Sequence, residues 1–150
     1  MQLPWVRAAL VVALVAVSLG LGLWRRRRDG QLRTTSSLAR VTGAELDHPL
    51  GARATLLQIS AEFCSPCRAA HRVLQQAAAN LPGVHHVEVD AAERLDLVKR
   101  FDVMRTPTVL VLDPDGAVVH RASGVPRLDQ IIAAVPNHAV PNRAAGSPRA

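Results

Sequence analysis

An uncharged apolar segment near the N-terminus sets the first part of this chain apart from the rest. Ala8–Trp24 contains 17 residues without a charge, and four arginines follow it directly at 25–28. With its apolar flank, a helix rising about 1.5 Å per residue is long enough here to cross a hydrocarbon core of roughly 30 Å. Trp5 and Trp24 lie near the two ends, where indole rings favour the lipid headgroup region. We therefore predict a transmembrane anchor at 4–24.

A cleaved secretory signal is the competing interpretation of this segment. Signal peptides place positive charge before the apolar run and small residues at a cleavage site. Here one arginine precedes the run and four follow it, which favours an uncleaved anchor. Because basic residues beside a span stay in the cytoplasm, we predict a single-pass protein of the cell membrane with its domain on the cytoplasmic side. The opposite topology stays open as an alternative.

The remaining chain reads as one domain between two polar flanks. We expect a basic stop and flexible linker at 25–42, rich in Arg, Ser and Thr, and a disordered tail at 136–150, rich in Pro and Ala. The domain between them, 43–135, has nine Lys or Arg against eleven Asp or Glu, a net charge of −2, although the whole chain carries +6. This charge and the scarcity of aromatic residues argue against a nucleic-acid partner.

Apolar patterning inside the domain alternates between strand and helix. Short apolar runs predict strands at 55–60, 84–89, 107–112 and 117–121, and apolar residues at helical spacing predict helices at 70–81, 95–101 and 126–135. Helices between the first strands imply parallel pairing, and the turn sequence “DPDG” makes the last two strands an antiparallel hairpin. We expect an α/β fold with a mixed sheet and helices on both faces.

The two cysteines of the chain, Cys64 and Cys67, lie where the first of these strands passes into its helix. A thiol attacks a disulfide as its thiolate, and the N-terminus of a helix stabilises negative charge on Cys64. Cys67, one helical turn later, lies within disulfide reach and can resolve a mixed disulfide on Cys64. Pro66 fits the first helical turn and stiffens the loop. The pattern predicts a redox pair.

Two unrelated buried thiols or half of a zinc site are the alternatives. Zinc takes about four ligands, and near the cysteines the sequence offers only His71 as a third. We therefore expect no metal and no cofactor. His71 could also tune Cys67, although a partly exposed structural histidine is the simpler interpretation.

The domain resembles the thioredoxin family over most of the stretch from Ala54 to 135. The resemblance rests on “AEFCSPC”, the “VEVD” strand, “FDVMRTPT” and Gly124. It implies a thioredoxin-like fold and thiol–disulfide exchange through Cys64 and Cys67. Because the segment before Ala54 is short, we expect the first strand and helix of the family to be reduced.

The resemblance also implies the substrate-binding residues. It places a cis peptide bond between Thr106 and Pro107 opposite the cysteines, where the Thr106 backbone can pair with an extended substrate. Phe63, in the position where thioredoxins usually carry Trp, is the third expected substrate contact.

Three residues are expected to tune the pair. Thioredoxins usually have “WCGPC”, whereas this chain has “FCSPC”, so Ser65 and Pro66 stand between the cysteines. The strand position that is often a buried Asp in thioredoxins is Gln58, which cannot accept a proton at neutral pH. The usual base is then missing or replaced by water, and we expect slower or differently tuned reduction.

These observations predict a membrane-tethered thiol–disulfide oxidoreductase that acts as a reductant. Its expected partners are proteins that carry disulfides, a reductase that donates electrons, and the membrane through the N-terminal helix. One alternative is an extracytoplasmic thioredoxin-like protein that acts in cytochrome maturation or on exported proteins. Another is a non-enzymatic metal chaperone or docking module.

Overall fold

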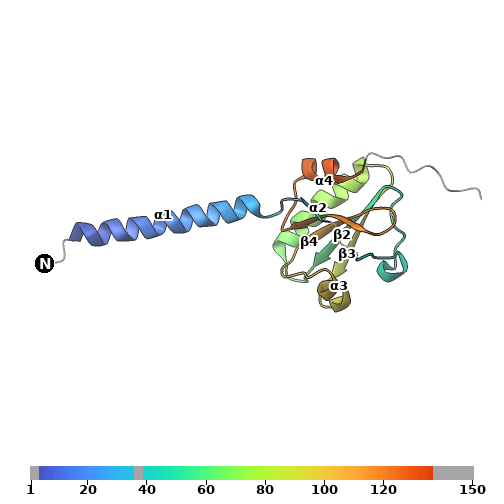
Figure 1. Ribbon diagram of the computed structural model, residues 1–150, viewed down its shortest axis with the longest axis horizontal. Helices are drawn as coiled ribbons and strands as arrows, with labels where there is room; N and C mark the ends of the chain where they lie inside the picture. The colour runs from blue at the N-terminus through green and yellow to red at the C-terminus, as the bar shows by residue number, and fades with distance from the viewer. Residues whose placement is uncertain (1–3, 36–38, 137–150) are drawn as a thin grey trace, which may run out of the picture.

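A long N-terminal helix projects from a sheet that carries helices on both faces (Figure 1). The computed structural model describes residues 4–35 and 39–136, so the tail predicted at 136–150 lies, after its first residue, outside the described residues. The helices are α1 (Pro4–Arg28), α2 (Ser65–Asn80), α3 (Leu95–Arg100) and α4 (Leu128–Ala134), with a 3-10 turn η1 (Ala44–Leu46). The strands are β1 (Arg33–Thr34), β2 (Ala54–Ser60), β3 (Val84–Asp90), β4 (Thr108–Leu112) and β5 (Val118–Ser123).

The sheet is mixed, with the strand order β1-β5-β4-β2-β3. β2 pairs with β3 in parallel, while β4 is antiparallel to β2 and β5 is antiparallel to β4. The mixed sheet is confirmed, but parallel pairing does not extend to β4. The physical reason is the length of α3: its six residues span about 9 Å. The seven residues of β3 span about 23 Å. The chain therefore enters β4 from the end at which β3 stops.

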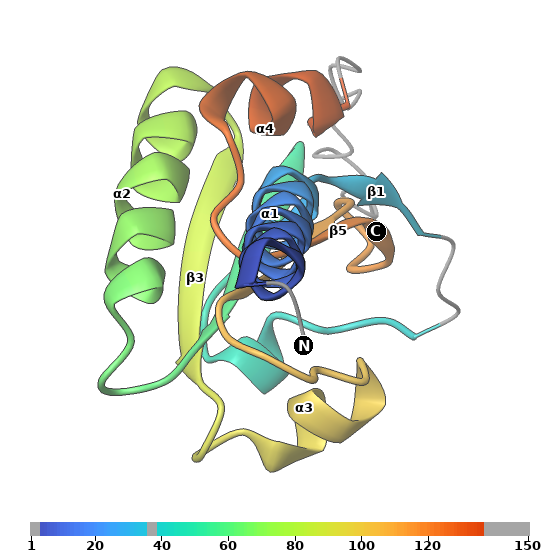
Figure 2. The ribbon, with the colours of Figure 1, turned by 90° about the vertical axis from the view of Figure 1, so that its left-hand side faces the viewer.

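Side chains of the central strands alternate between two apolar cores. Leu56 packs with Leu74 and the other apolar residues under α2 and α4. Leu57 packs with Leu97 on the opposite face, under α3 and η1. Figure 2 shows the sheet between α2 and α4 on one side and α3 on the other. Because β2 is covered on both faces, all of its seven residues are buried, as its short apolar run predicts.

The segment after α1 is docked on the domain, which differs from the expected flexible linker. The Gly30 N–H donates to the Ser123 carbonyl oxygen at 2.7 Å. Arg33 and Thr34 pair with β5, and Val41 is completely buried. Its polar composition favours a mobile chain, but the open edge of β5 supplies partners for the backbone groups of the linker. β1 and η1 are short, as expected for a reduced first strand and helix.

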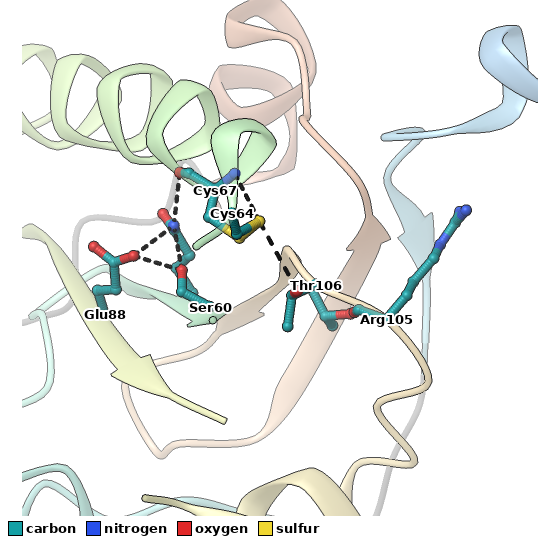
Figure 3. The surroundings of a disulfide bond; sticks show 8 residues. Ser60, Cys64, Cys67, Glu88, Arg105 and Thr106 are labelled. Carbon is teal, nitrogen blue, oxygen red and sulfur yellow. Dashed lines mark hydrogen bonds between the residues drawn. A yellow bond between two sulfur atoms is a disulfide. The ribbon is translucent and has the colours of Figure 1, made fainter. Parts of the chain in front are cut away.

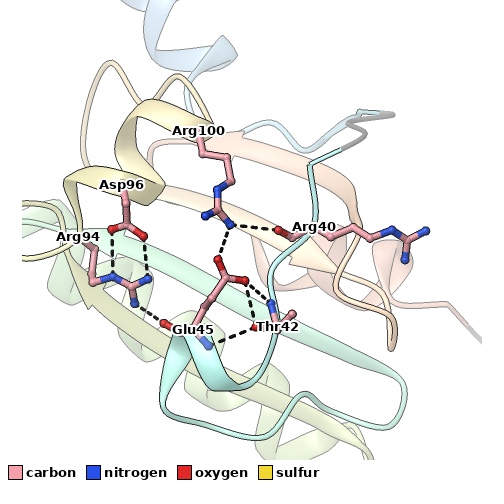
Figure 4. Close-up of polar contacts among 6 residues, drawn as sticks. All are labelled: Arg40, Thr42, Glu45, Arg94, Asp96 and Arg100. Carbon is pink, nitrogen blue, oxygen red and sulfur yellow. Dashed lines mark hydrogen bonds and ion pairs between the residues drawn. The ribbon is translucent and has the colours of Figure 1, made fainter.

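Charged side chains hold η1 against α3 (Figure 4). Glu45 accepts hydrogen bonds from the Thr42 backbone N–H at 2.8 Å and from Arg100 Nη1 at 2.6 Å. The Thr42 N–H, followed by the Arg100 guanidinium, holds the pKa of Glu45 below its usual value. Arg94 donates to the Glu45 carbonyl oxygen at 2.5 Å and forms an ion pair with Asp96. This network closes one end of the core under α3.

Helix α1 stands apart from both cores. Within it, Trp5–Arg25 is 21 residues long with a mean hydropathy of 2.3, and none of this stretch is buried against the rest of the described chain. Its apolar side chains face outward on every side; Leu14, for example, is 67% exposed. A helix of this length and composition near the N-terminus fits a membrane span or a signal sequence.

Gly116 is the position where the turn between β4 and β5 leaves no room for a side chain. Its φ is +79°, and a Cβ there would lie 1.9 Å from the Val41 carbonyl oxygen. We expect Gly116→Ala to lower the free energy of unfolding by about 2 kcal/mol or more, because the strained backbone and the clash add. Urea unfolding of the full-length protein in detergent, followed by circular dichroism, measures this change.

The matched control is Asp115→Ala in the same turn. The Asp115 side chain is exposed, so its removal should change the free energy of unfolding by less than about 0.5 kcal/mol. Equal effects of the two substitutions would contradict the prediction.

Candidate active site

The two cysteines form a disulfide at the start of α2, with an S–S distance of 2.06 Å. Cys64 is the N-cap residue, and its Sγ accepts the Cys67 backbone N–H at 3.1 Å. Ser65 and Pro66 are exposed in the first turn, where proline removes no helical hydrogen bond. Cys67 is 3% exposed, whereas Cys64 is only partly buried. One sulfur is therefore open to a partner and the other is shielded.

The loop before β4 faces this disulfide (Figure 3). The peptide bond between Thr106 and Pro107 is cis, as the resemblance implies. Thr106 Oγ1 lies 3.9 Å from Cys64 Sγ. Pro107 is buried, and its carbonyl oxygen accepts the Gly124 N–H at 2.7 Å. The structure thus brings together two segments that lie about forty residues apart in the sequence.

Two large apolar side chains are exposed on the segments that carry these groups. Phe63, directly before Cys64, is 93% exposed. Met104, two residues before Thr106, is 83% exposed, and the sequence did not single it out. Exposed apolar side chains beside a reactive group are typical of surfaces that contact a partner.

Gln58 lies at the centre of a polar network under Cys67. Figure 3 labels two of its members, Ser60 and Glu88. Gln58 is completely buried, and its Nε2 donates to the Cys67 carbonyl oxygen at 3.0 Å and to Glu88 Oε1 at 2.9 Å. Ser60 Oγ lies 2.7 Å from Gln58 Nε2 and donates to the same Glu88 oxygen at 2.5 Å, so one N–H of the amide is shared between Ser60 and Glu88. An amide occupies the expected strand position, and a carboxylate lies directly beside it.

The sequence did not identify Glu88 or Ser60 as part of the site. Ser60 is the last residue of β2, and Glu88 lies in β3, where the parallel register sets it opposite Gln58. The signal that the sequence offered was Glu88 itself, a charged residue between the two valines of “VEV” in this strand. His71 completes the group: its Nδ1 lies 2.6 Å from Glu88 Oε2, and its side chain is 39% exposed.

His86 holds the Gln58 amide from the other side. Its Nε2 lies 3.2 Å from Gln58 Oε1, and its ring contacts the ring of His71 edge-on with centroids 4.9 Å apart. Burial, followed by the nearby His71, lowers the pKa of His86 to about 4. His86 is therefore neutral at pH 7, and an N–H on Nε2 fits the amide oxygen of Gln58. This contact directs the amide NH2 group toward Cys67 and Glu88.

A pocket of about 530 Å³ opens beside the disulfide. Its lining comes from the end of β2, the first two turns of α2 and the end of β3. The lining residues are Ser60, Ala61, Glu62, Cys64, Cys67, Arg68, His71, Arg72, Glu88 and Asp90. Within residues 4–35 and 39–136, no group of three or more His, Cys, Asp or Glu side chains is arranged to hold a metal ion.

Comparison with known proteins gives a consistent family. The sequence profile of the family named Thioredoxin matches residues 38–137. Thioredoxin of Chlamydia trachomatis is 34% identical over 80 residues, which cover 53% of this chain and 78% of that protein. Thioredoxin-2 of Pyricularia oryzae is 33% identical over 81 residues, and these cover 53% of this chain and 47% of that protein. The chain thus spans about half the length of the fungal relative.

Solved structures agree on the fold alone. Chloroplastic thioredoxin z superimposes with a TM-score of 0.51 at 22% identity, covering 67% of this chain and 93% of that chain. Fasciola hepatica thioredoxin gives a TM-score of 0.50 at 23% identity, covering 57% of this chain and 84% of that chain.

The lowered pKa of His86 predicts a loss of stability in mild acid. In the unfolded chain His86 takes up its proton near pH 6.5, but in the folded protein only near pH 4. Its contribution is therefore fully present above pH 6.5 and is lost as the pH falls toward 4. Allowing for the partial exposure of the ring, we expect the free energy of unfolding to be about 1–2 kcal/mol lower at pH 5 than at pH 7 on this account.

Urea unfolding at both pH values tests this, with His86→Gln as the comparison. Gln keeps an N–H toward Gln58 but does not titrate, so most of the His86 contribution to the pH dependence should disappear. An identical difference between pH 7 and pH 5 in the two proteins would contradict the assignment.

Proposed function

We propose that this chain, which belongs to the thioredoxin family, is a membrane-tethered thiol–disulfide oxidoreductase that reduces protein disulfides. The observation that carries the proposal is the Cys64–Cys67 disulfide at the start of α2, with Thr106 facing Cys64. An accessible sulfur beside a shielded one suits a pair in which one cysteine attacks and the other resolves.

The reduced pair acts in two exchange steps. The Cys64 thiolate, held by backbone N–H groups at the N-terminus of α2, attacks one sulfur of the substrate disulfide and releases the other as a thiolate. The Cys67 thiolate then attacks Cys64 Sγ, which forms the Cys64–Cys67 disulfide and releases the second substrate thiolate. Both substrate thiolates take up the protons that the two cysteines lost. Two electrons pass from the pair to the substrate.

The proposed substrate contacts are Phe63, Thr106 and Pro107. The exposed ring of Phe63 suits an apolar residue next to the substrate cysteine. The Thr106 backbone, on the loop facing Cys64, suits an extended peptide. Ser65 and Gln58 are the proposed tuning residues together with Pro66, since they stand beside the sulfurs or under Cys67.

Membrane tethering is proposed from α1 and its basic end. The span Trp5–Arg25 has the length and hydropathy of a transmembrane helix, and the four arginines at 25–28 favour a cytoplasmic domain. The cytosol keeps thiols reduced, so the pair would rest there as a dithiol. Each turnover leaves the pair oxidised, so a reductase must then return two electrons to it.

The activity is tested by insulin-disulfide reduction with dithiothreitol as the electron source. We expect the full-length protein in detergent to accelerate the reaction and Cys64→Ser to reduce the rate to that of dithiothreitol alone, because the attacking sulfur is gone. Cys67→Ser should instead accumulate mixed disulfides on Cys64, visible on non-reducing gels. Full activity of Cys64→Ser, or no acceleration by the unaltered protein, would rule the proposal out.

The topology is tested by fusions after Ala150. A fluorescent protein that folds only in the cytoplasm should be bright, and alkaline phosphatase, active only outside, should be silent. Replacing the arginines at 25–28 by Asn should weaken or reverse this pattern, because these charges set the orientation. A phosphatase-positive, fluorescence-negative result for the unaltered chain would instead support the extracytoplasmic alternative.

A further inference from the structure

The strand position under the shielded Cys67 sulfur holds Gln58, whose amide cannot accept the proton of the Cys67 thiol. Gln58, under Cys67, offers an amide whose oxygen faces His86 and whose nitrogen donates to Cys67 O. The carboxylate of Glu88 lines the same pocket as the two cysteines. From this arrangement we propose that Glu88 accepts the proton of the Cys67 thiol when the pair exchanges disulfides. The proposal rests on the proposed function, because it concerns the second of its two steps.

The network holds the Glu88 carboxylate in the pocket that Cys67 also lines. Its Oε1 accepts hydrogen bonds from Gln58 Nε2 and Ser60 Oγ, at 2.9 and 2.5 Å. Gln58 is in turn held between His86 and the Cys67 carbonyl oxygen. A chain of short contacts therefore connects the carboxylate to the backbone of the residue whose thiol must lose a proton. Such supporting hydrogen bonds keep a proton acceptor in place while the disulfide forms and breaks.

The other carboxylate oxygen of Glu88 faces outward. Oε2 lies 2.6 Å from His71 Nδ1, and the two side chains are 34% and 39% exposed. A proton taken up on the inner side can pass to water or to His71 on the outer side. Glu88 thus connects the shielded thiol with solvent, which Gln58 cannot do because an amide holds no extra proton.

In the reductive direction the step begins at the Cys67 thiol. The Cys67 S–H bond breaks and the proton moves to Glu88, directly or through one water in the pocket. The resulting Cys67 thiolate attacks Cys64 Sγ of the mixed disulfide, so one S–S bond forms and one breaks. The departing substrate thiolate takes up a proton from Glu88 or solvent. In the oxidative direction the same carboxylate returns the proton to Cys67.

Several other charged groups face this pocket and bear on any pH dependence. Glu88 is approached from β3 by His86 and from α2 by His71. The remaining charged residues of the lining are Glu62, Arg68, Arg72 and Asp90. Variants must therefore change the carboxylate at 88 without altering the rest of this set.

The reaction of the reduced full-length protein with 5,5′-dithiobis(2-nitrobenzoate) separates the two steps. Attack by Cys64 releases the first thionitrobenzoate, and attack by Cys67 on the mixed disulfide releases the second. At pH 7 we expect Glu88→Gln to slow the second release on the order of 100-fold and the first by less than about threefold. The difference should narrow toward pH 9, because hydroxide then competes with the carboxylate as the acceptor of the Cys67 proton.

Two variants separate this role from a structural one. In Gln58→Glu/Glu88→Gln the carboxylate and the amide trade places across the β2–β3 register, so the second release should recover at least tenfold over Glu88→Gln. Glu93→Gln removes one charge from an exposed position outside the pocket and should leave both releases as in the unaltered protein.

Three results would overturn the proposal. They are an unaltered second release in Glu88→Gln, equal slowing of both releases, and slowing that persists at pH 9 without recovery in the exchanged variant. If the unaltered protein itself fails to release the second thionitrobenzoate, the proposed function fails and not only the role of Glu88.

Discussion

The parallel pairing of β2 with β3 is the interaction on which the rest of the site depends. β3 pairs with one edge of β2, while β4 pairs with the other and the two apolar cores cover its faces, so the whole strand is buried. β2 then ends at Ser60 and delivers Cys64 to the start of α2. The same register sets Gln58 opposite Glu88. One ladder of backbone hydrogen bonds thus positions the sulfurs and the carboxylate that lies beneath them.

A polar group inside a core destabilises the fold unless each donor and acceptor is satisfied. Here the amide of Gln58 meets that condition with partners on three elements: Ser60 in β2, Glu88 and His86 in β3, and the Cys67 carbonyl in α2. The protein therefore keeps polar chemistry beside a shielded thiol without an unpaired group at Gln58. A neutral His86 belongs to this solution, because burial and the nearby His71 disfavour its charged form.

The sequence predicted the elements of the domain and the cysteine pair, because these depend on local periodicity and spacing. The sequence predicted a strand at Val109 and its neighbours, which is β4. It did not predict that β4 runs antiparallel to β2, because this direction depends on how far α3 carries the chain. The docked linker was missed because its composition is polar and its partners lie on β5. Glu88 was missed for a related reason: its role comes from strand register, and residue 88 lies 30 positions from Gln58.

The hydrogen bond from Gly30 to Ser123 holds the segment that follows α1 against the domain. Asp29, the first residue after α1, forms an ion pair with Arg105 at 2.7 Å and lines a cavity together with Pro66 and Thr106. If α1 lies in a bilayer, as we propose, this short docked connection holds the disulfide close to the point where the helix leaves the lipid. In that arrangement the protein meets its substrates by lateral diffusion in the plane of the membrane. Only substrate disulfides near the membrane surface then come within reach of Cys64.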